Sequence, residues 1–238
     1  MPTVLSGRGP VMVSSGAPIR GIPVKLLRFP YSPFALKVQC LLGLAGVRFA
    51  VEDVPYGDRS GLVAVTGGYI HVPVLVDDAG VAHVDSRVIS ELVVSRFAPS
   101  LVPSPLEGPI WAYADWSDQV LEDPCFKLAV PGILRRFQRP VDRALYTLIK
   151  ERRYGAGCVQ GWERSATQLL EQSRAALAPS DRTLSARPFL FGDRPTLADA
   201  ALWGQLGMLR YAGIAPSALG EALPAFVGRL EEASGVRG

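Results

Sequence analysis

Hydrophobic residues in the first fifty or so positions form two short runs separated by a longer run with helical spacing. Strands are predicted over Val24–Phe29 and, with mixed polarity, over Val47–Val54. Between them, Ser32 and Pro33 have the form of an N-cap followed by proline at the first helical position. The apolar stripe that follows predicts a helix that ends near Gly46. These segments predict a β-α-β unit with parallel strands.

A strand–turn–strand–helix unit follows over residues 72–97, after a loop or short helix. Valines at alternate positions predict a strand over 72–76, and a second short strand covers 81–84. The residues between them, 77–80, have turn chemistry. Asp85-Ser86 then opens a pattern with helical spacing. The order β-α-β then β-β-α predicts an α/β, thioredoxin-like domain, in which helices cover both faces of a mixed sheet.

The chain changes character at residues 99–105, where three of seven residues are proline, so we place a linker there. Beyond it only helical spacing recurs, which predicts an all-α C-terminal domain. Segments with this spacing are 110–122, 125–137, 140–153 and 160–177. Ser104 and Glu107 have the spacing of a capping box, which would start the first of these helices. The expected division is a mobile extension (1–22), a thioredoxin-like domain (23–98), the linker and a helical domain (106–238).

The composition of the chain argues against several classes of function. The chain has 238 residues, of which 48% are hydrophobic and 20% charged, and a net charge of +3. This is a globular composition, and the charge is too weak to predict nucleic-acid binding. Three widely spaced cysteines and two histidines predict no metal site and a reducing, cytoplasmic location. No apolar run is long enough to predict a membrane span.

Two short motifs suggest a binding site for a peptide with charged ends. A cis Val72–Pro73 bond would turn the backbone of Val72 outward, where it can pair with an extended peptide; alternatively, Pro73 simply begins an edge strand. Asp85 and Ser86 stand where free helix N–H groups attract a carboxylate, although they can equally serve as a cap. Together, V-P-V-L followed by D-S resembles the glutathione site of the glutathione S-transferase family.

The resemblance implies roles for these residues. In that family the residue before the cis-proline pairs with the cysteinyl backbone of glutathione, which implies this role for Val72. The acidic residue and the serine hold the γ-glutamyl end, which implies this role for Asp85 and Ser86. The family more often has Glu in place of Asp85. His71 stands where relatives often direct Lys or Gln toward the glycyl carboxylate; a partly exposed strand-end histidine is the alternative.

A second marker lies near the C-terminus, so the resemblance runs from Val24 to the end of the chain. Gly192, Thr196 and Asp199 resemble the family's G-x-x-x-T-x-A-D motif, which caps a buried helix and serves folding. The family usually forms homodimers, and the resemblance therefore implies a homodimer here.

Ser32 matches the catalytic serine of transferases with an S-P-F helix start. A hydroxyl hydrogen bond would stabilise the thiolate of glutathione, which is the nucleophile. Tyr31 is the rival hydroxyl, and a plain N-cap is the alternative for Ser32. Since position 32 is not cysteine, addition or substitution by the thiolate is favoured over disulfide exchange.

The second substrate is expected to be a small apolar electrophile bound between the domains. Candidate pocket residues are Phe34, Tyr113, Trp116 and Phe126, although aromatic residues at helical spacing often belong to the core. We interpret Lys37 as solvated and Cys40 as an inert core thiol. The basic residues between 135 and 153 could favour anionic partners, but a solvated helical face is the default interpretation. The expected function is a detoxifying glutathione transferase. A non-catalytic binding protein of the same fold and a glutathione-dependent lyase or isomerase are the alternatives.

Overall fold

The computed structural model describes residues 24–237, so the predicted extension over 1–22 lies outside the described residues. The strands described form one sheet in the order β2-β1-β3-β4. Their bounds are β1 Val24–Arg28, β2 Phe49–Asp53, β3 Val74–Val76 and β4 Ala82–Val84. β1 pairs parallel with β2 and antiparallel with β3, which in turn pairs antiparallel with β4. The predicted mixed sheet is therefore present.

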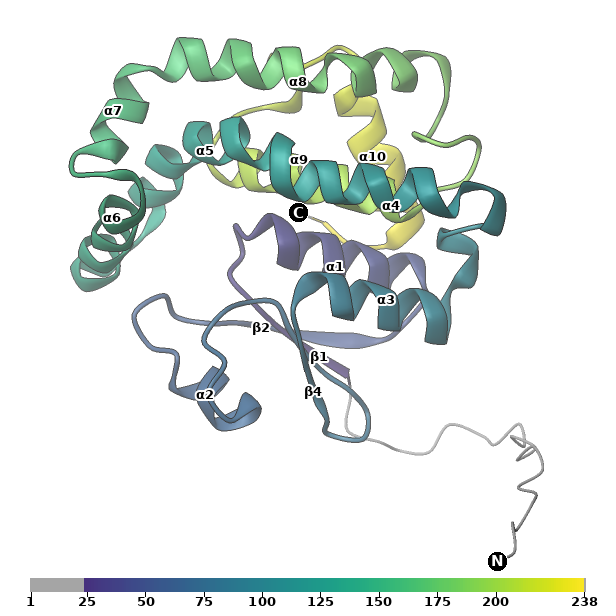
Figure 1. Ribbon diagram of the computed structural model, residues 1–238, viewed down its shortest axis with the longest axis horizontal. Coiled ribbons are helices and arrows are strands. Elements are labelled where there is room, and N and C mark those ends of the chain that lie inside the picture. Colours follow the sequence, from purple (N-terminus) through teal and green to yellow (C-terminus); the bar gives the residue numbers. More distant parts are fainter. Residues whose placement is uncertain (1–23, 238) are drawn as a thin grey trace, which may run out of the picture.

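Helices cover both faces of this sheet (Figure 1). α1 (Pro33–Leu44) and α3 (Ser86–Phe97) lie on the face toward the helical domain, and the short α2 (Ser60–Thr66) lies beyond the other face. This confirms the thioredoxin-like fold class. β3 begins at Val74, two residues later than predicted, because Pro73 has no N–H with which to extend the ladder.

The rest of the chain is helical, as predicted. The helices are α4 Glu107–Trp116, α5 Glu122–Arg136, α6 Pro140–Tyr154, α7 Cys158–Arg164, α8 Ala166–Ala186, α9 Leu197–Tyr211 and α10 Leu223–Ser234. A π-helical turn, η3 (Ser117–Leu121), joins α4 directly to α5. The predicted gap near residue 123 is therefore wrong, and α10 was not predicted.

The linker segment is partly ordered into 3₁₀ turns. These are η1 (Pro99–Leu101) and η2 (Ser104–Leu106), and a third, η4 (Pro216–Ala218), precedes α10. The capping box predicted at Ser104 is wrong: Ser104 lies inside η2, and α4 begins at Glu107 without a side-chain cap.

The buried helix α9 holds the two halves of the molecule together. It packs along α1, and the apolar side chains of both halves form one continuous core. A Cβ atom at Gly204 would lie 2.3 Å from the carbonyl oxygen of Pro33, which no real contact allows. Glycine at this position therefore lets α9 approach the first turn of α1, the turn that carries Ser32.

Thr196 and Asp199 form a reciprocal capping box at the start of α9. The carboxylate of Asp199 accepts hydrogen bonds from the backbone N–H and the hydroxyl of Thr196, at 2.8 and 2.7 Å. It also accepts one from the N–H of Leu190 at 2.8 Å. Asp199 is fully buried, and burial raises the pKa of its carboxyl, while these hydrogen bonds act in the opposite direction. The box thus anchors the helix against which α1 packs.

Candidate functional site

Ser32 is the N-cap of α1 and lines a cavity between the two domains. Its Oγ accepts a long hydrogen bond from the N–H of Ala35, at 3.4 Å, and the residue is 9% exposed. Pro33 occupies the first helical position, as the sequence predicts. The hydroxyl therefore lies at the positive end of a helix and at the cavity. Because its oxygen only accepts in the cap bond, its own proton is free to be donated.

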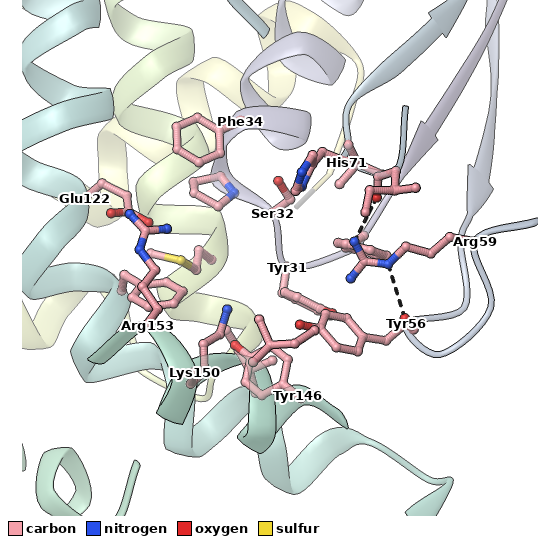
Figure 2. Close-up of a pocket in the computed structure, with 18 of the residues that line it drawn as sticks. Tyr31, Ser32, Phe34, Tyr56, Arg59, His71, Glu122, Tyr146, Lys150 and Arg153 are labelled. Carbon is pink, nitrogen blue, oxygen red and sulfur yellow. Dashed lines mark hydrogen bonds between the residues drawn. The ribbon is translucent and has the colours of Figure 1, made fainter. Parts of the chain in front are cut away.

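The segment before β3 lines the same cavity. The Val72–Pro73 peptide bond is cis, and the paired register of β3 with β1 ends at Val74, so Val72 lies outside the ladder. Arg59 fixes this segment by donating a hydrogen bond to the carbonyl oxygen of Ile70, at 2.7 Å. His71 is exposed and also lines the cavity. Ser32 and Val72, taken from separate parts of the sequence, thus line one cavity. Figure 2 shows Ser32 and His71 at this cavity.

Asp85 and Ser86 lie at the start of α3, outside the residues that line this cavity. Asp85 has φ 72°, a left-handed conformation that is uncommon for a residue other than glycine and is found preferentially at functional sites. One oxygen of its carboxylate accepts hydrogen bonds from the N–H groups of Arg87 and Val88, at 2.8 and 3.2 Å. The carboxylate therefore caps α3, and its second oxygen has no hydrogen bond among the described residues.

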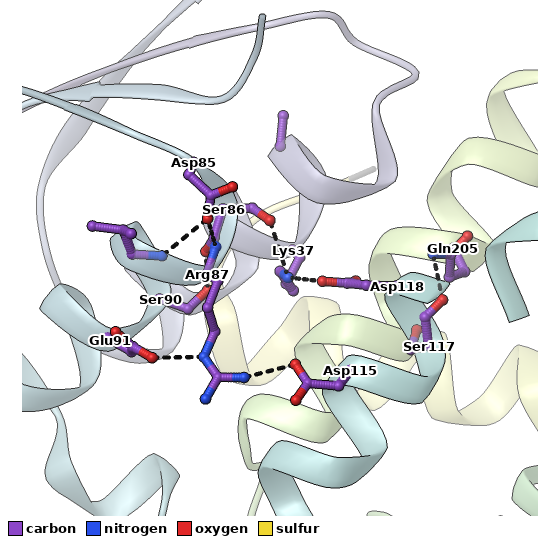
Figure 3. Close-up of polar contacts among 12 residues, drawn as sticks. Lys37, Asp85, Ser86, Arg87, Ser90, Glu91, Asp115, Ser117, Asp118 and Gln205 are labelled. Carbon is purple, nitrogen blue, oxygen red and sulfur yellow. Dashed lines mark hydrogen bonds and ion pairs between the residues drawn. The ribbon is translucent and has the colours of Figure 1, made fainter. Parts of the chain in front are cut away.

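Lys37 links this end of α3 to the helical domain (Figure 3). Its ammonium donates to the Oγ of Ser86 at 3.3 Å and pairs with the carboxylate of Asp118 in η3. Lys37 is 3% exposed, so the expectation that it is solvated is wrong. Burial raises the pKa of Asp118, against the opposing effect of Lys37. The pair crosses the boundary between the domains and orients the hydroxyl of Ser86.

The cavity has a volume of about 460 Å³, within the range of small-molecule sites. Its walls are mainly apolar, and several of the apolar side chains are aromatic. The aromatic residues are Phe29, Tyr31, Phe34, Tyr56, Phe126, Tyr146 and Tyr154. Of the pocket residues proposed from the sequence, Phe34 and Phe126 line the cavity. Tyr113 and Trp116 do not: the Tyr113 hydroxyl lies 2.8 Å from the Oγ of Ser180, and Trp116 packs on Tyr113.

Tyr31, the rival of Ser32, also lines the cavity, but its ring belongs to the aromatic cluster. It stacks on Phe29 and contacts Phe137 and Tyr146 edge-on. Burial raises the pKa of Tyr31 far above its ordinary value, so its phenol stays neutral. Its hydroxyl has no hydrogen-bond partner among the described residues. The Tyr31 hydroxyl thus keeps a proton to donate, within a cluster of aromatic rings.

Four charged side chains also line the cavity: Arg59, Glu122, Lys150 and Arg153. Burial lowers the pKa of Lys150 to about 8. It raises the pKa of Glu122 to about 7, and nearby Arg153 opposes that rise. The sequence predicted Lys150 and Arg153 as part of a solvated basic face, and it gave no role in the site to Arg59 or Glu122. Tyr146, Lys150, Arg153 and Tyr154 are spaced to share one face of a helix, and this spacing was the available signal.

The three cysteines are free, and Cys40 and Cys125 are buried. Burial raises the pKa of the Cys40 thiol, which makes it a poor nucleophile, in line with the expected core role. Among residues 24–237, no group of three or more histidine, cysteine, aspartate or glutamate side chains is arranged to hold a metal ion. No helix in the same range is long and apolar enough to cross a membrane.

Two family profiles match the chain, one for each half. The profile of the glutathione S-transferase N-terminal domain matches residues 26–101, and that of the C-terminal domain matches residues 134–231. The chain belongs to the glutathione S-transferase family. No curated protein matches it in sequence.

Solved structures of two glutathione transferases and a glutaredoxin share its fold at low identity. Glutathione transferase GSTFuA3 from Phanerochaete chrysosporium is 20% identical, with a TM-score of 0.75, over 92% of this chain and 99% of that chain. CsGST63524 from Ceriporiopsis subvermispora, solved in complex with glutathione, is 16% identical, with a TM-score of 0.77, over 91% and 99%. Glutaredoxin 2 from Salmonella typhimurium, also solved with glutathione, is 17% identical, with a TM-score of 0.68, over 90% and 95%.

Proposed function

We propose that the protein is a glutathione transferase that binds glutathione in this cavity and adds its sulfur to an electrophilic substrate. The observation that carries the proposal is the convergence of Ser32 and Val72 on one cavity between the domains. Family membership and the glutathione complexes of two structural neighbours support it.

Ser32 would stabilise the reactive form of glutathione. A free thiol has a pKa of about 8.5, so only a few per cent is thiolate at pH 7. A hydrogen bond from a hydroxyl to a charged acceptor contributes about 1.5–3 kcal/mol, which corresponds to a pKa lower by roughly one to two units. The N-terminus of α1 favours negative charge at the same point.

The rest of glutathione would lie along the sheet domain. The free backbone of Val72 is suited to pair with the cysteinyl residue, as an added strand does. The second carboxylate oxygen of Asp85 is available for the γ-glutamyl amine. Because the Oγ of Ser86 accepts from Lys37, its proton is free to be donated to the γ-glutamyl carboxylate. His71 would face the glycyl carboxylate.

The test is calorimetric titration with glutathione, followed by conjugation to a chlorodinitrobenzene at pH 7. We expect binding, turnover, and a kcat at least about tenfold lower in Ser32→Ala, with Kd for glutathione little changed. Ser32→Thr, which keeps a hydroxyl, should retain more activity than Ser32→Ala. Ser95→Ala, an exposed serine of α3 outside the cavity, is the matched control.

Other results would redirect the assignment. Full activity in Ser32→Ala with an inactive Tyr31→Phe would move the hydroxyl role to Tyr31. Binding of glutathione without turnover of any electrophile would favour a non-catalytic binding protein. Isomerisation or elimination without a stable conjugate would favour a lyase or isomerase. Absence of glutathione binding would refute the proposal.

The proposal includes a homodimer and a detoxifying role in the cytoplasm. The three free cysteines are compatible with a reducing compartment. Light scattering at micromolar concentration should give about twice the mass of one chain; a single-chain mass would contradict the dimer.

A further inference from the structure

Helices α5 and α6 form the wall of the cavity opposite the sheet domain, and this wall carries unpaired positive charge. Lys150 and Arg153 come from α6, and Glu122, at the start of α5, is the carboxylate among the described lining residues. Arg153 lies close enough to Glu122 to affect the pKa of that carboxyl. Nevertheless, none of these three side chains forms an ion pair with another described residue, whereas Lys127, on the outer surface of α5, pairs with Asp123 at 2.7 Å.

The Lys150 ammonium has no hydrogen-bond acceptor among the described residues. Its ammonium lies 4.7 Å from the ring centroid of Phe126 and 4.6 Å from that of Tyr146. Contacts with ring faces stabilise the charge but accept none of its three N–H groups in the way that an oxygen does. The surroundings also remove water from the ammonium. Figure 2 shows its nitrogen directed into the cavity.

Flat apolar surface lies beside this charge. The Phe126 ring packs against Tyr154 with centroids 6.0 Å apart, and Tyr146 packs against Tyr56 at 5.1 Å. Aromatic walls accept a ring by stacked or edge-on contact. The site thus offers a slot for a ring, with cations at one end and the Ser32 hydroxyl on the opposite wall.

We propose that the second substrate is an aromatic electrophile that carries an anionic group, and that Lys150 and Arg153 bind this group. The proposal rests on the proposed function and narrows its substrate class. In the reaction with a chloroarene, the thiolate sulfur forms the C–S bond, the C–Cl bond breaks, and chloride leaves with the electron pair. The thiol proton passes to solvent. The anionic group takes no part in bond making.

The carboxylates of glutathione are not the expected partners of this wall. Their proposed partners, Ser86 and His71, lie on the sheet domain, whereas Lys150 and Arg153 belong to α6. If the cations instead served glutathione, their removal would weaken glutathione binding. The experiment separates these two roles.

A matched pair of substrates tests the proposal: 4-chloro-3,5-dinitrobenzoate and its methyl ester, which differ in the negative charge. After correction for the uncatalysed rates, we expect kcat/KM to be at least about tenfold higher for the benzoate, as charge-assisted hydrogen bonds allow. Lys150→Met, which keeps an apolar stem against Phe126 and Tyr146, should remove most of this preference. It should change kcat/KM for the ester, and KM for glutathione, by less than about threefold.

Two further variants and a binding measurement complete the test. Lys150→Arg should restore the preference, and Arg153→Gln should reduce it. Arg152→Gln removes the same charge from an exposed position of α6 outside the cavity and should leave the preference unchanged. Titration with unreactive 3,5-dinitrobenzoate and its methyl ester measures the preference without turnover.

The outcomes distinguish a failure of the anion-binding inference from a failure of the transferase proposal. Equal preference for benzoate and ester, or a preference that survives in Lys150→Met, would overturn the inference. An equal effect of Arg152→Gln and Arg153→Gln would also overturn it, because the charge would then act only at long range. Higher KM for glutathione in Lys150→Met would assign the cation to the cosubstrate instead. If 3,5-dinitrobenzoate binds in a Lys150-dependent way but nothing is conjugated, the anion site stands and the transferase proposal fails.

Discussion

The sheet-domain wall of the cavity is built from backbone and helix ends, whereas the α5–α6 wall is built from side chains. Ser32 contributes the N-terminus of α1, and Val72 contributes backbone that lies beyond the paired part of β3. The position of each depends on where its helix or strand begins. Lys150 and Arg153 are instead side chains of the C-terminal part of one helix, α6.

Because the two walls are built differently, we expect them to recognise different parts of the bound molecules. A backbone surface is insensitive to most substitutions but is lost when an element shifts. A side-chain surface can be changed one residue at a time while the fold stays the same. We therefore expect the first wall to hold the constant cosubstrate and the second to set the choice of electrophile. The two walls can be distinguished by the stability of the fold, by the position of Ser32 and by the charge of the α5–α6 wall.

The largest effect on stability is expected at the buried ion pair that links α1 of the sheet domain to η3 of the helical domain. Lys37→Met removes one member of the buried Lys37–Asp118 pair and leaves the Asp118 charge uncompensated, which should lower the free energy of unfolding by about 3–5 kcal/mol. Urea denaturation measures this. Lys127→Met breaks the more exposed pair with Asp123 and should cost less than about 1 kcal/mol. Equal losses in the two variants would show that the Lys37 pair does not hold the domains together.

A smaller effect is expected where α9 meets α1. A methyl group at Gly204 would collide with the carbonyl of Pro33, so Gly204→Ala must shift the first turn of α1. We expect a loss of about 1–3 kcal/mol in stability, and weaker glutathione binding by calorimetry, because Ser32 moves with that turn. Gly228→Ala in α10, where no atom lies within 4 Å of the added Cβ, is the matched control. It should be neutral or stabilising. Unchanged glutathione binding in Gly204→Ala would contradict the claim that this approach positions the site.

The smallest effect is expected from pH acting on the α5–α6 wall. Lys150, with a pKa of about 8, loses its positive charge as pH rises, and Glu122, with a pKa of about 7, becomes negative. The groups that act on Lys150 are Glu122 from α5, Arg153 on its own helix, Arg59 before α2 and Cys158 at the start of α7. Both titrations make the cavity less positive.

The benzoate-to-ester ratio of kcat/KM should therefore fall by about three- to tenfold between pH 6.5 and 9. Taking the ratio cancels the rise in thiolate, which is common to both substrates. In Lys150→Met the ratio should fall less, because only the titration of Glu122 remains. A ratio that rises with pH would reverse the expected sign and contradict the charge assignment.

Much of the sheet domain was predictable from local patterns. Ser32-Pro33, the alternating valines and Asp85-Ser86 each carry a signal within a few residues, because caps, strands and turns depend on near neighbours. The order of these signals was sufficient to predict the fold class that the structure confirms. The roles of Ser32, Val72 and Asp85 in binding glutathione remain predictions.

The helical domain was less predictable in detail. The π-helical turn η3 between α4 and α5 changes which side chains share a face, and nothing in the apolar spacing indicates it. Phe126, which follows this turn, lines the cavity, whereas Tyr113 and Trp116, which precede it, do not.

The sequence by itself determined the strands and main helices of the sheet domain, their order and the cap that starts α9, because each depends on contacts among residues close along the chain. Only the tertiary structure decided that Lys37 is buried against Asp118 and that Lys150 shares a cavity with Ser32. A charged residue has the same local pattern whether its helix face meets water or another element. The packing of elements that are distant in sequence sets its neighbours, and those neighbours set its chemistry.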